Sequence, residues 1–132
     1  MSSSERDNMI IELKNMVVPE LRNKRFKGSF PHFRRISEDK IDLITFQFDR
    51  YGGGFVVEVG VCPPEGFTQS WGEKVPPYKV TVHDIDDRLR LKQNDGQWFR
   101  YDVDVENIYE HVAKDVLNHL YEAEEYWDKK GK

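Results

Sequence analysis

The chain has 132 residues, a formal net charge of −4, and 33% charged against 38% hydrophobic residues. This length fits one domain, residues 1–132, and is long enough to bury a sizeable core. The composition excludes a membrane-spanning helix, because no apolar run approaches roughly 20 residues, and an intramolecular disulfide, because Cys62 is the single cysteine. The N-terminus lacks the cationic start and apolar core of a signal peptide, so we expect a cytoplasmic protein.

The N-terminal segment predicts a helix from Ser2 to about Lys24. Apolar residues recur there at helical spacing, at Ile10, Leu13, Val17 and Leu21. Pro19 interrupts the pattern, because proline lacks a backbone N–H and its ring clashes with the preceding turn. We expect either a kink or a second short helix that begins at Pro19, where proline suits the first turn.

The segment Arg22–Arg35, which we call the basic segment, carries six basic side chains and no acidic one. Phe26, Phe30 and Phe33 alternate with these charges, and cations with aromatic rings are typical of nucleic-acid surfaces. We favour a structural interpretation, because the whole chain is acidic: the rings anchor the core and the charges are solvated.

Residues Ile41–Cys62 predict two strands joined by a glycine turn, and we call them the central hairpin. Apolar and polar side chains alternate with period two in both halves, and Gly52, Gly53 and Gly54 allow positive φ between them. A triple glycine could instead cradle a phosphate, but that motif needs a helix directly after it and a strand follows here. We expect Phe33–Ile36 to pair with the hairpin, and the rest of the chain to cover one of its faces.

The loop Pro63–Pro77 contains four of the six prolines and two aromatic residues, Phe67 and Trp71. A loop of this length in a compact domain is often functional or mobile. The two aromatic side chains either close the edge of the core or, if exposed, form a contact surface.

Three further elements are expected towards the C-terminus. Tyr78–Val82 predicts a strand, with Val80 and Val82 facing inward. Leu89–Leu91 and Gln97–Tyr101 predict a hairpin around an Asp-Gly turn. Residues Val105–Asp128 predict a helix capped by Asp104, with an apolar stripe of Ile108, Val112, Val116 and Leu120 that Trp127 closes.

His111, Asp115 and His119 have the spacing of metal ligands on one side of this helix. The first and last lie about 12 Å apart along a straight helix, so they form a poor cage, and we favour a structural role. His83 lies beside acidic residues and could act as a general base, but no nucleophile motif accompanies it.

The charge is unevenly distributed along the chain. Residues 102–128 contain nine acidic side chains and one lysine, and the basic segment carries six positive charges. The two segments either face one another or leave the domain dipolar. Acidic surfaces attract basic partners, so Glu110, Asp115 and Glu122 on the final helix are candidate binding residues.

The order of motifs VVPELRNKRFK, FPHFRR and IDLITFQFDRYGGGFVVEVGV resembles the bacterial family catalogued as domain of unknown function 4304. The residues of this chain that match the family pattern are Pro19, Leu21, Phe26, Lys27, Phe33, Phe46, Gln47, Phe55, Val57, Gly60 and Val61. The chain departs from it at Arg25, where the family usually has glycine. The family name states no activity, so the resemblance implies no catalytic residue; small bacterial families of this type often resemble immunity proteins of toxin systems.

We expect an α+β fold, with an antiparallel sheet of about five or six strands and the N- and C-terminal helices packed on one face. We expect a non-catalytic, protein-binding domain without cofactor or metal, and specifically an immunity or inhibitor protein that neutralises a toxin or effector. Its contact surface would be Phe67 and Trp71, or Glu110, Asp115 and Glu122. The alternatives are a small-molecule or nucleic-acid binding module and, less favoured, a metal-dependent hydrolase.

Overall fold

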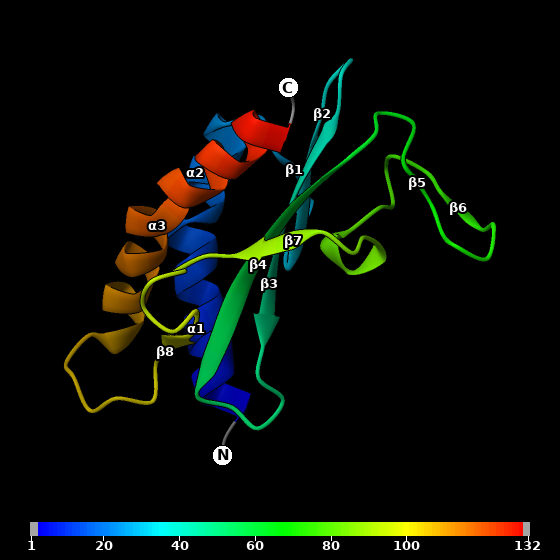
Figure 1. Cartoon of the computed structure of the whole chain (residues 1–132). Coiled ribbons are helices and arrows are strands. Elements are labelled where there is room, and N and C mark those ends of the chain that lie inside the picture. Colours follow the sequence, from blue (N-terminus) through cyan, green and yellow to red (C-terminus); the bar gives the residue numbers. More distant parts are fainter. Residues whose placement is uncertain (1–2, 131–132) are drawn as a thin grey trace.

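A computed structural model describes residues 3–130, which form an α+β fold (Figure 1). In chain order the elements are α1 (Ser3–Met16), α2 (Val18–Asn23), β1 (Lys27–Ser29), β2 (His32–Ile36), β3 (Ile41–Phe48), β4 (Gly54–Cys62), β5 (Phe67–Thr68), β6 (Lys74–Val75), the 3-10 helix η1 (Val82–Asp84), β7 (Arg88–Arg90), β8 (Phe99–Arg100) and α3 (Ile108–Lys130). Ser2, where the first helix was predicted to begin, lies outside the described residues. Within residues 3–130, no helix has both the length and the apolar composition needed to cross a membrane.

The sheet is antiparallel and has six strands, as expected. Its order is β1-β2-β3-β4-β7, and β8 also pairs with β4. The central hairpin is confirmed, because β3 and β4 pair from Ile41 opposite Cys62 to Phe48 opposite Phe55. Alternating β-branched and aromatic residues suit such a pleated surface, which explains why this pair was the clearest strand signal.

Strand β2 confirms the predicted segment Phe33–Ile36 and begins one residue earlier. Strand β1 was not predicted. It pairs with β2 and places Lys27 directly opposite Arg34. The three residues Lys-Gly-Ser of β1 have no apolar alternation, so its formation depends on the open edge of β2.

The predicted hairpin of Leu89–Leu91 and Gln97–Tyr101 is wrong. Strands β7 and β8 do not pair with one another; both pair with β4, at different positions along the same edge. The Asp-Gly turn lies instead in a loop that leaves the sheet between the two strands. A long neighbouring strand with a free edge competes successfully with a local hairpin, because it offers the same backbone hydrogen bonds.

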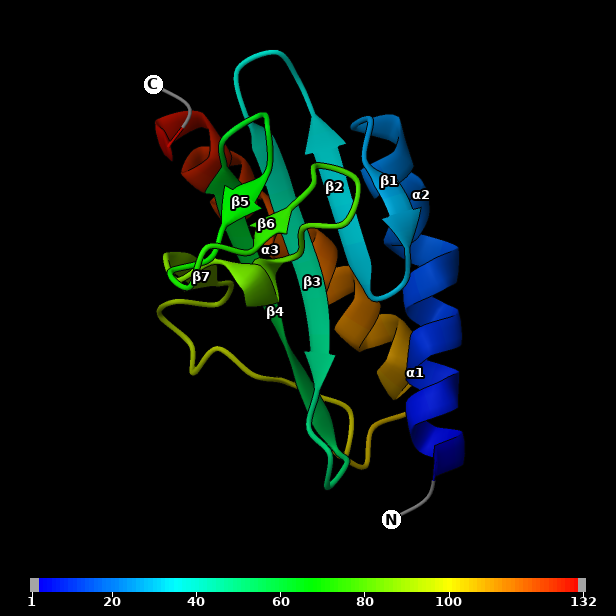
Figure 2. The same cartoon turned by 90° about the vertical axis from the view of Figure 1, so that its right-hand side faces the viewer.

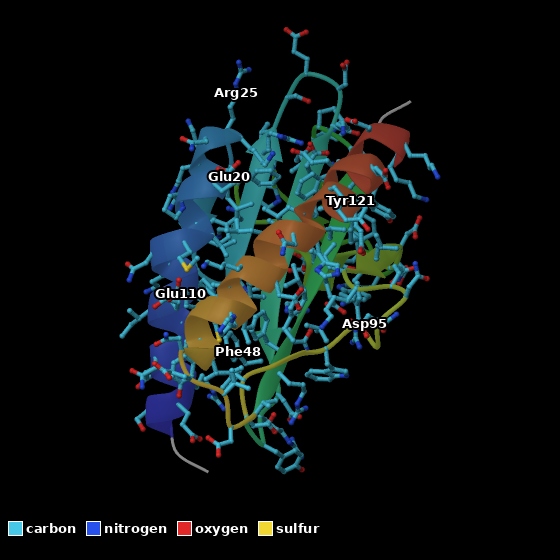
Figure 3. The ribbon with its side chains drawn as sticks, turned by 90° about the vertical axis from the view of Figure 1, so that its left-hand side faces the viewer. Glu20, Arg25, Phe48, Asp95, Glu110 and Tyr121 are labelled. Atoms are coloured by element: carbon cyan, nitrogen blue, oxygen red, sulfur yellow. The ribbon has the colours of Figure 1, made fainter. Side chains whose placement is uncertain are left out.

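Helices α1 and α3 lie side by side on one face of the sheet, as expected (Figure 3). Their apolar stripes pack against β3 and β4, and Trp127 closes the far end of the core as predicted. Its Nε1 donates a hydrogen bond to the Leu43 carbonyl at 3.2 Å, and its ring centroid lies 4.8 Å from that of Phe26.

The boundaries of both predicted helices differ from the prediction. Because α2 begins at Val18 with Pro19 in its first turn, the second-short-helix alternative is the correct one. Helix α3 begins at Ile108 and not at Val105. Asn107 has a left-handed backbone, with φ of 58°, so helical geometry does not extend back to Asp104.

The opposite face of the sheet carries a second, smaller core, so the expectation that only one face is covered is wrong. It consists of Ile41, Leu43, Cys62, Val80, Val82 and Ile85. Apolar side chains from residues 63–86, a segment that lies in front of the sheet in Figure 2, pack onto this face and cover it.

The predicted strand Tyr78–Val82 is wrong, because it is a loop that enters η1. The Asp84 carboxylate accepts a hydrogen bond from the Thr81 backbone N–H at 2.8 Å, which starts this helical turn. Val80 and Val82 are buried as predicted, but in the second core.

Candidate binding surfaces

Residues 63–77 form an arm that extends away from the sheet (Figure 1). Strands β5 and β6 pair within it, and the Gln69 N–H donates to the Glu73 carbonyl at 2.7 Å near its tip. At the base, Gly66 has φ of +103°, and a Cβ there would collide with the Val75 carbonyl oxygen. Only glycine fits this position, so the arm has a defined hairpin geometry.

The two aromatic residues proposed from the sequence have different surroundings on the arm. Phe67 is partly buried and packs against the second core. Trp71 is 72% exposed, and its Nε1 donates to the Glu73 carboxylate at 3.2 Å. Phe67 therefore anchors the arm, and Trp71 is presented to solvent.

The three carboxylates proposed on the final helix also differ. Among the described residues 3–130, Glu110 forms an ion pair only with Lys114, one turn further along α3, at 3.1 Å. Asp115 pairs with Lys92 at 3.2 Å, and Glu122 accepts the Lys92 backbone N–H at 3.0 Å. Asp115 and Glu122 therefore hold the loop between β7 and β8, and they do not form a free acidic face with Glu110.

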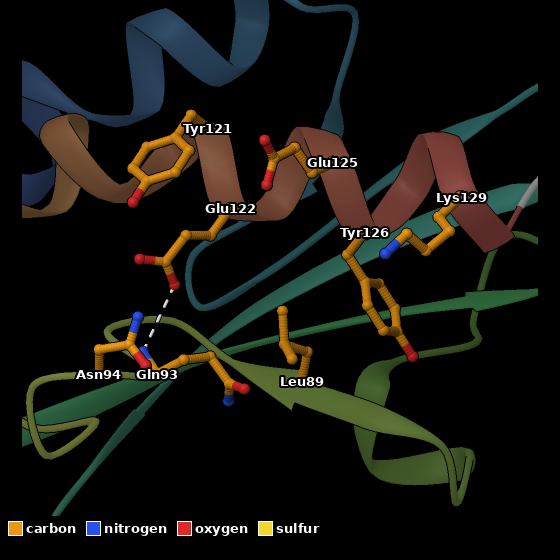
Figure 4. A pocket seen from close by; sticks show the side chains of 8 residues that line it. All are labelled: Leu89, Gln93, Asn94, Tyr121, Glu122, Glu125, Tyr126 and Lys129. Atoms are coloured by element: carbon orange, nitrogen blue, oxygen red, sulfur yellow. Dashed lines mark hydrogen bonds between the residues drawn. The ribbon is translucent and has the colours of Figure 1, made fainter.

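A shallow groove of about 290 Å³ lies between α3 and this loop (Figure 4). It is lined by Leu89, Gln93, Asn94, Tyr121, Glu122, Glu125, Tyr126 and Lys129. Because both acidic and basic side chains line it, the groove has no single sign of charge that would select a ligand.

The acidic and basic segments meet at one place. Lys24 pairs with Glu124 at 2.9 Å, and Arg35 pairs with Asp42 at 2.8 Å and with Glu124 at 3.6 Å. The guanidinium of Arg35 also lies over the Phe26 ring, 4.7 Å from its centroid. Part of the basic segment therefore stabilises the contact between α3 and the sheet.

Three other cations of this segment line a separate pocket of about 270 Å³, which we call the basic pocket. Its walls are Arg25, Lys27, Arg34, Ile36 and Tyr78. Arg25 lies at the end of α2 (Figure 3), the next two residues lie on β1 and β2, and Tyr78 follows the arm. Within residues 3–130 no carboxylate pairs with any of the three cations.

The excess of positive charge in this segment is visible in the sequence, but the pocket was not predicted from it. The basic segment could have indicated the pocket, but we expected its charged side chains to be solvated. The missing information was the register of β1, which places Lys27 beside Arg34. That register requires Gly28, whose φ is +118° and where a Cβ would lie 2.6 Å from the His32 carbonyl oxygen.

The histidines differ in their surroundings. The His119 Nδ1 lies 2.7 Å from the Asp115 carbonyl oxygen, and His111 is exposed. Among residues 3–130, no three histidine, cysteine or acidic side chains come close enough to hold a metal ion. The exposed His83 ring lies 5.4 Å from that of His32, whose pKa is lowered by burial and by the charges of His83 and Arg34.

Cys62 lies at the end of β4 in the second core. Burial, followed by the nearby charges of Asp84 and Glu65, raises the pKa of its thiol to about 11. The thiol is therefore protonated at neutral pH, which favours a structural role over a nucleophilic one.

One of three comparisons with known proteins finds a match for this chain. The model of a family described as "Domain of unknown function (DUF4304)" matches residues 17–129. Comparison with curated proteins, and with solved structures, found no match. The matched range covers the sheet, the arm, the basic pocket and all of α3 except Lys130.

Proposed function

Because the chain belongs to the DUF4304 family, whose description states no function, we propose from its own surface that it is a non-catalytic protein-binding domain. One observation carries the proposal. The Trp71 side chain is 72% exposed at the tip of a hydrogen-bonded arm. When a tryptophan side chain is buried at an interface, it contributes more to binding than almost any other side chain, so an exposed one at this position favours a binding role.

The build of the arm supports this proposal. Phe67 packs against the second core, and Gly66 fixes the close approach of the two arm strands. A surface that is already ordered loses little conformational entropy on association, so more of the contact energy appears as affinity.

In its specific form, the proposal is that the partner is a toxin or effector and that the chain acts as its immunity or inhibitor protein in the bacterial cytoplasm. A projecting hairpin with an aromatic tip is suited to entering a concave surface, as long binding loops do in other proteins. Such an insertion would block access to the partner's cleft.

The test compares Trp71→Ala with Tyr51→Ala. Tyr51 is a matched control, because it is 73% exposed and also lies at a hairpin turn, between β3 and β4. Immobilised wild-type and variant proteins would capture partners from the native host, and the purified partner would then be titrated by calorimetry. We expect Trp71→Ala to weaken binding by about 30-fold, corresponding to a hot spot of about 2 kcal/mol, and Tyr51→Ala to leave it unchanged.

Two results would overturn the proposal. One is a purified partner whose affinity is the same for wild type and Trp71→Ala. The other is capture that yields no stoichiometric partner from the native host under conditions in which the toxin or effector is present.

A further inference from the structure

We propose that the basic pocket binds an acidic segment of the protein partner, with the carboxylates of that segment paired to Arg25, Lys27 and Arg34. The inference rests on the proposed function, because it names the chemistry of the surface that the partner presents. It adds a second contact site, separate from the tip of the arm.

Two of the three cations lie on the paired strands β1 and β2. Lys27 and Arg34 are direct partners in the antiparallel β1–β2 pair, so their side chains leave the same face of the sheet. Like charges in this position repel one another. The Arg34 guanidinium does not turn away, because its Nε and Nη2 donate to the Val80 carbonyl at 3.1 and 2.9 Å.

Arg25 is the third cation of the pocket. Arg25 follows α2 in a left-handed backbone conformation, with φ of 75°, which is uncommon for a residue with a side chain. Its N–H still bonds the Arg22 carbonyl at 2.9 Å, so its position is defined. Lys24 and Arg35 of the same segment each pair with a carboxylate of this chain, whereas the three cations of the pocket have none in residues 3–130.

The walls of the pocket also include two side chains without a charge. Ile36 is 52% exposed and Tyr78 is 68% exposed, so an apolar surface lies beside the three charges. A pocket of about 270 Å³ is slightly below the range of roughly 300–1,000 Å³ that encloses a whole small molecule. It is suited to one or two side chains of a peptide in which an apolar residue lies beside acidic ones.

These observations favour a peptide over a nucleic acid. Proteins that bind single strands use a positively charged groove that follows several successive phosphates, about 4–16 nucleotides per domain. Here the three cations that have no carboxylate partner within residues 3–130 line one small pocket, where the Val80 carbonyl holds the Arg34 guanidinium in place. The neighbouring Lys24 and Arg35 are paired with carboxylates, so the basic segment does not present a continuous row of cations to successive phosphates.

The test uses the isolated, isotope-labelled protein and an acetylated, amidated peptide EDLDE, with the neutral peptide QNLNQ as its matched control. At about 50 mM NaCl, we expect EDLDE to cause saturable amide shifts in residues 25–36 and at Tyr78. We expect these shifts to weaken at about 500 mM NaCl, because salt screens exposed charges, and QNLNQ to cause none.

Lys27→Glu should abolish the shifts, because it reverses the charge in the middle of the pocket. Lys14→Glu makes the same change in net charge on α1, at an exposed lysine that forms no ion pair with residues 3–130, and should leave binding intact. An oligothymidylate of about eight nucleotides is titrated in parallel.

Three outcomes would overturn the inference: no saturable shift with EDLDE, equal binding by Lys27→Glu, or tighter binding of the oligothymidylate than of the peptide. The experiment needs no natural partner, so its failure is distinguishable from failure of the proposed function. A partner whose affinity depends on Trp71 but not on Lys27 would overturn only the inference about the basic pocket. A partner whose affinity is unchanged by Trp71→Ala would overturn the proposed function.

Discussion

Because Lys27 and Arg34 are direct cross-strand partners of like charge, we expect the wild-type chain to be less stable than a variant that carries no positive charge at position 27. Lys27→Gln removes the repulsion, and Lys27→Glu replaces it with an attraction across the same two strands. Each cross-strand pair contributes about 0.2–1 kcal/mol, and Lys27 is exposed, so values at the lower end apply. We expect gains in the free energy of unfolding of about 0.3 kcal/mol for Lys27→Gln and about 0.6 kcal/mol for Lys27→Glu.

For a chain of this length, about 0.6 kcal/mol corresponds to a rise in Tm of roughly 2–3 °C, which thermal denaturation followed by circular dichroism resolves. Hydrogen exchange of the β1 and β2 amides gives a local readout of the same effect. Lys14→Glu is the control for net charge. At about 1 M NaCl the differences should largely disappear, because the Debye length falls to about 3 Å.

The reasoning is refuted if Lys27→Glu is less stable than wild type, or if its gain in stability is the same at low and high salt. The first result would show that the two side chains do not face one another. The second would show that the gain arises from strand propensity and not from charge.

Three other predictions concern the rest of the molecule. Cys62 should not react with a thiol reagent at about pH 8 until the chain is denatured, because its thiol pKa is raised to about 11; rapid labelling of the native chain would contradict this. The pKa of His32 is lowered, so its contribution to stability is complete above about pH 6.5 and declines as the pH falls; His32→Gln should lose less stability than wild type between about pH 7 and pH 5 in urea titrations, and equal losses would argue against it. Trp127→Phe removes the hydrogen bond to the Leu43 carbonyl and should lower the free energy of unfolding by about 2 kcal/mol, whereas a change below about 0.5 kcal/mol would show that this bond is dispensable.

The candidate site was predictable only in part. The arm was noticed from its prolines and its two aromatic residues, but their sequence does not distinguish Phe67, which is anchored, from Trp71, which is exposed. The acidic residues of the last helix were noticed from charge alone. Whether such a carboxylate is free depends on what lies opposite it, and for Asp115 and Glu122 that is the loop after β7.

The sequence by itself determined the central hairpin, the apolar stripe of α3 and the interruption at Pro19. Each of these depends on a local pattern: alternation with period two, apolar residues at helical spacing, or the missing N–H of proline. These three patterns are long or strong enough that the tertiary contacts agree with them, whereas the shorter pattern of Tyr78–Val82 was overridden.

Only the tertiary structure decided where β1, β7 and β8 pair, which face of the sheet residues 63–86 cover, and which cations remain without a carboxylate. Lys27 meets Arg34 because β1 joins the free edge of β2, and Lys92 meets Asp115 because the loop after β7 lies against α3. Short strands with little alternation take whichever edge is open, and an exposed charge pairs with whatever the fold brings near it. Both outcomes depend on contacts between segments far apart in the chain, which local periodicity does not encode.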